Sequence, residues 1–185
     1  MAVNNQYPVT ALDKSKLKVR SKNWPETNRA ATLEISAVNN NVWMKIWLNH
    51  PTVQTKGPVI AKFGLNEFAI FTEYLKDCAE KDHNAGAKFT NFTAGERVEG
   101  QPLNREVQSF IKVGRDEKGI LFIGVAVPEM PKVVFPLTIS YWFGIDDIED
   151  VNKERIFSNL AVRGWVKNIE QMLYYTLTNN HVDEK

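Results

Sequence analysis

Hydrophobic and polar residues alternate along eight short runs of this chain, and two longer stretches instead repeat their apolar residues at helical spacing. Four runs and one helical stretch come first, and the same order then recurs. The first copy covers residues 14–22, 32–38, 42–49, 58–65 and 66–82. The second covers 87–95, 106–116, 120–127 and 133–143, with a helix that starts at Ser158 or Asn159. The pattern predicts an α+β fold of two tandem ββββα units, each an antiparallel sheet with a C-terminal helix, packed as a pseudo-dimer.

Polar segments set the expected boundaries of the two units. We expect a flexible lead-in over residues 1–12, a first ββββα unit over 13–85, a second over 86–180 and a frayed tail over 181–185. Within the second unit, the stretch 96–104 is long enough for a mobile loop, and the acidic segment 145–155 predicts a linker or a short extra turn.

Each predicted helix has an apolar side. In the first helix, Asn66 is expected to cap the N-terminus, and the buried stripe is predicted to hold Phe68, Phe71, Leu75 and Cys78. In the second helix, the apolar side is predicted to hold Leu160, Ala161, Trp165, Ile169, Met172, Leu173 and Leu177. Pro136 lacks a backbone N–H, so the last strand is expected at a sheet edge or with a bulge.

Composition is that of an ordinary globular protein, with 43% hydrophobic and 24% charged residues among 185. The net charge of +1 divides into +3 over residues 1–85 and −2 over 86–185, so an anionic partner is expected to bind chiefly the first half. A single cysteine excludes an internal disulfide. With no signal peptide and no long apolar run, we expect a soluble cytoplasmic protein that does not contact a membrane.

Catalytic patterns are missing from the sequence. Its three histidines fit no triad or metal site, and it has neither a phosphate-binding glycine loop nor a nucleophile elbow. We therefore expect no enzyme, no cofactor and no metal. An alternative divalent-metal site would use Asp146, Asp147, Glu149 and Asp150, although an acidic surface loop is the commoner meaning. Cys78 is expected to be a buried, inert thiol.

Cations and aromatic residues recur on the predicted sheet face that points away from the helix. In the first strand, Lys14, Lys16, Lys18, Arg20 and Lys22 occupy every second position and would share one side. The third strand adds Trp43, Lys45 and Trp47, and the second unit offers Phe110, Lys112 and Phe122. Lysines neutralise phosphates, and aromatic rings on an open sheet stack on bases, so this face favours binding of a single strand.

The same residues are also compatible with purely structural roles. The face of Trp43 and Trp47 could be a seam covered by the other unit. The basic row at residues 14–22 could be a solvated edge strand whose charges discourage aggregation, or a disordered arm. Phe122 could be plain packing. The amino-acid pattern alone does not choose between these roles and binding.

The order ββββα–ββββα resembles the Whirly and PUR-repeat group, which includes coactivators of the positive-cofactor-four type and their phage-encoded relatives. The stretch GPVIAKFGLNEFAIFTEYLKD, a strand running straight into a phenylalanine-rich helix, is similar to the end of a coactivator-type unit. The resemblance is one of element order over about 165 residues. It implies binding of single-stranded DNA or RNA by curved basic and aromatic strands. It assigns binding roles to Lys16, Lys18, Arg20, Trp43, Lys45, Trp47 and Lys62, with Phe110, Lys112 and Phe122 as counterparts.

The expected function is therefore binding of single-stranded DNA with low sequence specificity, in support of replication or recombination, as in a phage protein acting in the host cytoplasm. RNA as a partner and a homo-oligomeric state are left open. The rival is a structural, adaptor or transcription-modulating protein that uses the aromatic face as a protein–protein interface.

Overall fold

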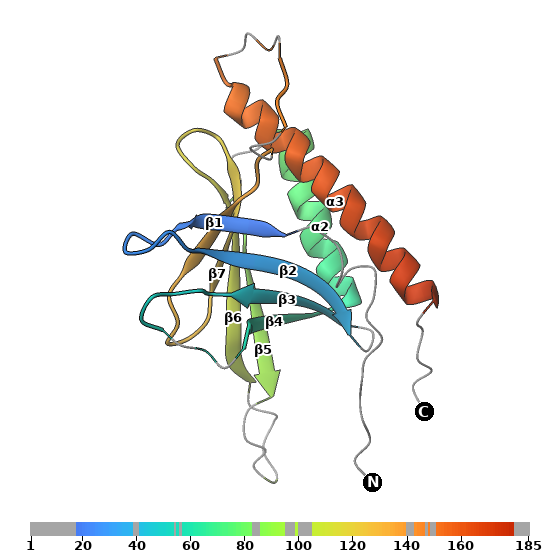
Figure 1. The fold of residues 1–185 in the computed structure, drawn as a ribbon. Helices are drawn as coiled ribbons and strands as arrows, with labels where there is room; N and C mark the ends of the chain where they lie inside the picture. Colours follow the sequence, from blue (N-terminus) through green and yellow to red (C-terminus); the bar gives the residue numbers. More distant parts are fainter. Residues whose placement is uncertain are drawn as a thin grey trace.

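A computed structural model shows two four-stranded antiparallel sheets and two long helices in the part of the chain that it describes (Figure 1). It describes residues 18–38, 41–53, 55, 57–82, 86–94, 99, 105–139, 143–146, 148 and 151–179. The strands of each sheet follow the chain order, β1-β2-β3-β4 and β5-β6-β7-β8. Each sheet is followed by a helix, so the predicted pair of ββββα units is confirmed.

Most elements fall close to the predicted runs, but β8 ends at residue 136 and does not continue to residue 143 as predicted. The first unit consists of β1 (Val19–Asn23), β2 (Ala30–Val38), β3 (Asn41–Trp47), β4 (Val59–Gly64) and α2 (Leu65–Glu80). The second consists of β5 (Lys88–Ala94), β6 (Arg105–Arg115), β7 (Leu121–Ala126), β8 (Val133–Pro136) and α3 (Lys153–Asn179). Pro136 ends β8, which is an edge strand as predicted.

One hydrophobic core joins the two units. The inner faces of both sheets and one side of each helix contribute to it, and α2 and α3 pack side by side (Figure 1). The edge strand β1 lies against β8, and β4 lies near β5. The largest fully buried side chains are Phe68, Phe71 and Phe135. Because the inner faces share this core, the outer face of each sheet points away from it.

The start of α2 corrects one prediction. Asn66 is not the N-cap: the helix begins at Leu65, and Gly64 holds the cap position without a side-chain hydrogen bond. The cause is that β4 runs straight into the helix, so the last extended residue of the strand becomes the cap. The predicted stripe of Phe68, Phe71, Leu75 and Cys78 is confirmed as buried.

The second helix departs further from the prediction. It begins at Lys153, five residues before Ser158, and so takes in the end of the segment predicted to be a linker. Its buried stripe is Ser158, Val162, Val166, Ile169 and Leu173. Leu160, predicted to be buried, is 42% exposed. The buried side of α3 is therefore rotated about the helix axis relative to the predicted side, because Ser158, Val162 and Val166 face the sheets. Leu177 is among the residues whose side chains are not described.

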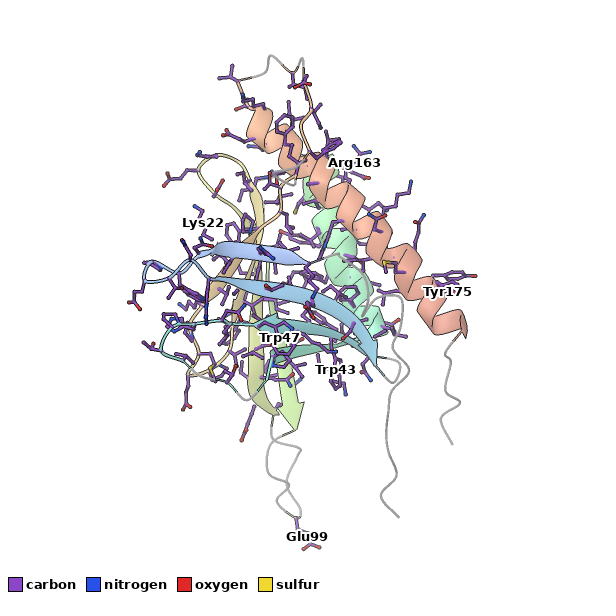
Figure 2. The ribbon with its side chains drawn as sticks, viewed as in Figure 1. Lys22, Trp43, Trp47, Glu99, Arg163 and Tyr175 are labelled. Carbon is purple, nitrogen blue, oxygen red and sulfur yellow. The ribbon has the colours of Figure 1, made fainter. Side chains whose placement is uncertain are left out.

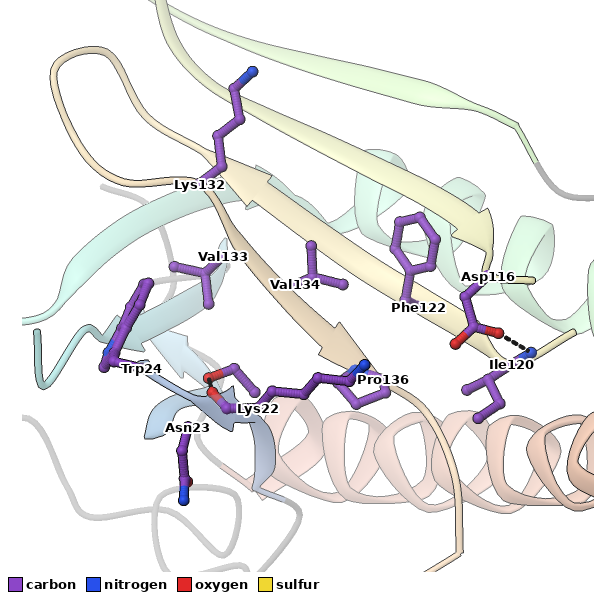
Figure 3. Close-up of a pocket in the computed structure, with 11 residues that line it drawn as sticks. Lys22, Asn23, Trp24, Asp116, Ile120, Phe122, Lys132, Val133, Val134 and Pro136 are labelled. Atoms are coloured by element: carbon purple, nitrogen blue, oxygen red, sulfur yellow. Dashed lines mark hydrogen bonds between the residues drawn. The ribbon is translucent and has the colours of Figure 1, made fainter. Parts of the chain in front are cut away.

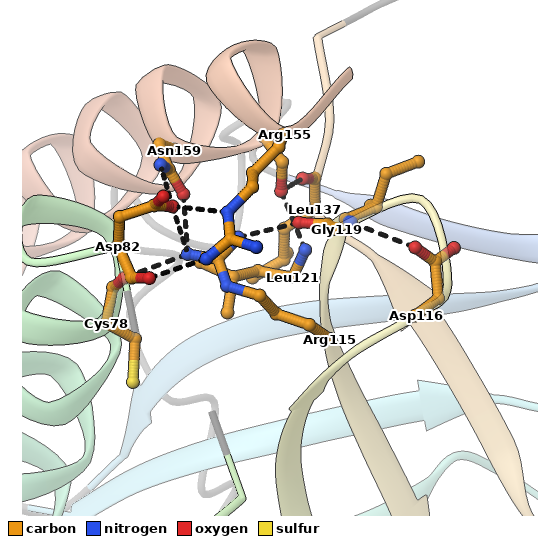
Figure 4. A network of polar contacts seen from close by, with 11 residues as sticks. Cys78, Asp82, Arg115, Asp116, Gly119, Leu121, Leu137, Arg155 and Asn159 are labelled. Carbon is orange, nitrogen blue, oxygen red and sulfur yellow. Dashed lines mark hydrogen bonds and ion pairs between the residues drawn. The ribbon is translucent and has the colours of Figure 1, made fainter. Parts of the chain in front are cut away.

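A polar network fastens the end of α2 to the second unit (Figure 4). Arg115 of β6, whose side chain is only 4% exposed, donates to the carbonyls of Cys78 and Gly119 and to Asn159 Oδ1. Asp82 accepts from Arg155 Nε at 2.6 Å and from Asn159 Nδ2 at 2.9 Å. Two cations thus lie at the C-terminal end of α2, where the helix dipole favours positive charge. The contacts also set α2 and α3 antiparallel.

Ser158 fixes α3 on the second sheet. Its buried hydroxyl donates to the Leu137 carbonyl at 2.6 Å and accepts from the Leu121 amide at 2.8 Å. The Leu137 amide in turn donates to the Leu121 carbonyl. Ser158 therefore does not start the helix, although the sequence predicted a start at Ser158 or Asn159. Its hydroxyl instead joins α3 to the beginning of β7. Among the described residues, no helix is long and apolar enough to cross a membrane.

Candidate nucleic-acid interface

The outer face of the first sheet carries half of the predicted binding residues. Strand register places them in three cross-strand rows. One row joins Arg20, Thr32 and Trp47, and the next joins Glu34, Lys45 and Ile60. The third joins Ser36, Trp43 and Lys62. Cations and indole rings therefore alternate across this face, as the sequence predicted.

The two tryptophans of β3 are not equivalent (Figure 2). Trp47 is 41% exposed and can offer its ring to a ligand. Trp43 is half-buried and lies nearer the helices, and its indole N–H is covered without a hydrogen-bond partner. The hydroxyl of Ser36, its cross-strand neighbour, is likewise buried and unpaired. Trp47 is therefore the better candidate for stacking, and part of the Trp43 ring serves packing.

The predicted row of five cations is only partly seen. Lys14 and Lys16 lie outside the described residues. Lys18 forms an ion pair with Glu34 at 2.5 Å, which offsets its charge on this face. Arg20 and Lys62 are exposed and have no ion-pair partner among the described residues, so their charges remain available to a phosphate.

An irregularity in β1 separates Lys22 from Arg20. The register shifts between Arg20 and Asn23, and the Ser21 hydroxyl accepts a hydrogen bond from the Ala31 amide at 2.9 Å. A side chain thus takes the place of a backbone carbonyl in the ladder. Lys22 is consequently carried to the edge that faces β8, where it lines a cavity with residues of the second sheet.

The outer face of the second sheet holds a corresponding set of residues. Lys88, Lys112, Gly124 and Val134 are cross-strand neighbours over all four strands, and Phe110 opposes Ala126. The Lys88 ammonium lies 3.8 Å from the centroid of the Phe110 ring, a cation–π contact. Lys112 is exposed and has no ion-pair partner in the described part of the chain. The predicted aromatic–cation pattern therefore occurs in both units.

Phe122 is neither core nor free surface. Its ring tip occupies the space above Gly114, where a Cβ would lie 2.5 Å from Cζ of the ring. Another ring atom, Cε2, borders Gly124, at 3.7 Å from the position of a Cβ there. The ring is therefore held over one glycine and forms a wall beside the other.

Two neighbouring cavities open on this side of the molecule. The first, the glycine hollow, has a volume of about 450 Å³ and is lined by Lys88, Phe110, Lys112, Phe122, Gly124 and Lys132. The second, the seam cavity between β1 and β8, has a volume of about 430 Å³ (Figure 3). Lys22, Trp24, Asp116, Phe122, Lys132 and Pro136 line it. Phe122 and Lys132 belong to both, so the cavities adjoin.

Charge in these cavities is mostly positive. Asp116, in the seam cavity, is the one acidic residue among the described residues that line either cavity. Its carboxylate accepts hydrogen bonds from the amides of Lys118 and Ile120, so its charge is partly compensated within its own turn. Trp24 is fixed in place because its indole N–H donates to the Leu48 carbonyl at 2.8 Å. The surroundings suit an anion with a flat apolar part.

Comparison of the chain with protein-family models, curated proteins and solved structures finds no match. The expected Whirly and PUR-repeat resemblance therefore stays a prediction, and the site has to be argued from its own geometry.

Several residues of this face could not be identified from the sequence pattern. Lys88 and Lys132 were missed because neither has an aromatic residue two positions away, where it would share the same face of a strand. Lys88 could have been found by pairing the first two strands of the second unit, which sets it opposite Lys112. Phe92, half exposed with Arg105 over its ring, was also missed.

The divalent-metal site that the sequence offered as an alternative falls mostly outside the described residues. Asp147, Glu149 and Asp150 lie outside the described residues, and no group of metal-ligating side chains is found among the residues that are described.

Proposed function

We propose that this protein binds single-stranded DNA with little sequence preference, through phosphate neutralisation and base stacking on the outer faces of its two sheets. The observation that carries the proposal is the adjoining pair of cavities, with an apolar aromatic wall at Phe122 and lysines at the rim. Arg20, Trp47 and Lys62 extend the same chemistry over the first sheet. A role in replication or recombination, as in phage-encoded proteins, follows as part of this proposal.

A single strand fits these surfaces better than a duplex does. Stacking on Phe122 or Trp47 requires a base whose flat side is free, and bases in a duplex are covered by their neighbours. The lysines and the rings contact groups that every nucleotide has, namely the phosphate and the face of the base. Low sequence preference is therefore expected. RNA has the same phosphates and base faces, so these surfaces would also bind an RNA strand.

Intrinsic tryptophan fluorescence tests the proposal directly. The protein is titrated with an unlabelled thirty-base single strand at low and at high salt, with a duplex of equal length and an RNA strand as comparisons. We expect the single strand to quench emission from Trp47 and from Trp24 of the seam cavity, and added salt to weaken binding steeply. The Trp47→Phe variant should lose the part of the quenching that comes from Trp47 while still binding a fluorescently labelled strand.

Two results would count against this function. Affinity that stays flat between low and high salt would remove the electrostatic part of the proposal. A stable higher oligomer that ignores every nucleic acid would favour the rival, in which the aromatic face is a protein–protein interface.

A further inference from the structure

The glycine hollow is created by small residues in the middle of a strand. On the outer face of β7, Gly124 stands opposite Lys112, and Ala126 stands opposite Phe110. Neither small residue fills the space between the larger side chains. A Cβ added at Gly124 would meet its nearest neighbours, in Lys112 and Phe122, at an ordinary contact distance of 3.7 Å. Gly124 also does not have the positive φ that would require a glycine, so what this residue provides is room.

The walls of the hollow are fixed from behind. The Phe122 ring rests over Gly114, so its position is set by a second glycine on β6. On the other wall, Lys88 lies over the Phe110 ring, which holds the ammonium at the rim. The volume of about 450 Å³ falls in the range of about 300–1,000 Å³ that is usual for small-ligand sites. A flat group of one to two rings can enter beside Phe122.

Charge decides what kind of flat group this is. Lys88, Lys112 and Lys132 surround the hollow, and no acidic residue is among the described residues that line it. An apolar floor with an aromatic wall and three cations at the rim matches a nucleotide, whose base is flat and whose flanking phosphates are anionic.

We propose that the glycine hollow is a subsite for one unstacked nucleobase of the bound strand, with Lys88, Lys112 and Lys132 facing its flanking phosphates. The inference rests on the proposed function and adds a discrete base-binding position to it. From this subsite the strand continues into the seam cavity, because Phe122 and Lys132 line both. There it meets Lys22 of β1, so a single strand passes from the second unit to the first.

Filling the hollow provides the test. Gly124→Val adds a branched side chain that strands favour, and its Cβ has room, so thermal stability should not fall. Affinity for a short oligothymidylate should fall about tenfold or more, as expected for one lost stacked base. The dependence of affinity on salt should keep its slope, because no charge has been removed. Gly144→Val, at a glycine that lines neither cavity, is the matched control.

Lys132→Gln should change the salt dependence, which Gly124→Val leaves unchanged. It should weaken binding and lower the salt slope by about 0.7, the value for one phosphate contact on a single strand. An abasic strand of the same length gives a readout on the unaltered protein. The affinity ratio between the oligothymidylate and the abasic strand should be smaller for Gly124→Val than for wild type.

The outcomes separate the subsite from the function as a whole. If wild type binds single strands and Gly124→Val binds them equally well, the base subsite is wrong and the proposed function stands. An unchanged oligothymidylate-to-abasic ratio in the variant overturns the subsite in the same way. If wild type binds no single strand at all, both the subsite and the proposed function fall.

Discussion

Asp82 Oδ1 lies 2.6 Å from Arg155 Nε, although 73 residues separate the two along the chain. The contact joins the end of α2 to the first turn of α3, and Arg115 approaches the same oxygen at 3.3 Å. The hydrogen bond from Arg155 is the main reason that the pKa of Asp82 is held below its ordinary value. A lowered pKa means that the folded protein favours the carboxylate over the protonated acid. The ionised form of Asp82 therefore stabilises the folded state.

The first prediction concerns pH. The stabilisation by Asp82 is present above the pKa of about 3.9 that an aspartate has in the unfolded chain, and it is lost as the pH falls through the lower folded value. Asp82→Asn should therefore unfold more easily than wild type near neutral pH, and the difference should shrink below about pH 4. The side chain is 52% exposed, so the neutral-pH difference should be about 1 kcal/mol or less.

Urea unfolding at several pH values measures this difference, with Glu106→Gln as a control at an exposed carboxylate that makes no ion pair with another described residue. A destabilisation by Asp82→Asn that stays constant down to strongly acidic pH would mean that the carboxylate charge is not the cause.

The second prediction concerns Arg115, whose guanidinium is almost fully buried. Arg115→Met removes the donors to the carbonyls of Cys78 and Gly119 and leaves these acceptors without their partner. We expect the free energy of unfolding to fall by about 3 kcal/mol. Lys118→Met, on the exposed turn of the same hairpin, is the control and should have little effect. Equal stability of the two variants would show that the network contributes little.

The third prediction separates the two tryptophans of β3. Trp47→Ala should weaken single-strand binding by about 1–3 kcal/mol and hardly change stability, because its ring is the exposed one. Trp43→Ala should also destabilise the fold, since its half-buried ring contributes to packing. Trp43→Phe keeps most of the ring and removes the unpaired N–H, so it should be close to neutral. Labelled-strand anisotropy measures the loss of binding, and thermal melting measures the loss of stability. If Trp43→Ala lost binding without losing stability and Trp47→Ala lost stability, Trp43 would be the stacking residue and Trp47 the packing residue.

The fourth prediction concerns the single cysteine. Burial is the main cause that raises the pKa of the Cys78 thiol, and the thiolate is the reactive form. A thiol-specific reagent should therefore label the native protein far more slowly than the urea-unfolded chain. Arg115→Met should be labelled faster than wild type, because it removes the hydrogen bond that Arg115 donates to the Cys78 carbonyl. Labelling of native protein at the unfolded rate would contradict the buried position.

The first helix was easier to predict than the second for a physical reason. In α2, phenylalanines and a leucine mark one side so strongly that the buried stripe could be assigned from spacing alone. In α3, large apolar residues occur on more than one side, and Leu160 is left exposed. In the early first turn of α3, Arg155 binds Asp82, a tertiary contact that no local pattern contains.

The candidate site shows the same division. Alternation within single strands placed Trp47, Lys62, Phe110 and Lys112 on outer faces correctly. It could not show that β1 lies against β8, because that neighbourhood joins the first strand of one unit to the last strand of the other. The seam cavity and its use of Lys22 and Lys132 therefore emerge only in three dimensions.

The adjacency of β1 to β8 and of β4 to β5 also bears on how the protein behaves at high concentration. An edge strand presents unpaired backbone groups, which invite edge-to-edge aggregation between molecules. Here each outermost strand of one sheet has an outermost strand of the other beside it, so the two units shield one another. Separating the two units would uncover four such edges at once. Each unit produced alone should therefore be prone to precipitate. In the whole protein, each unit covers the strand edges of the other and so protects it from aggregation.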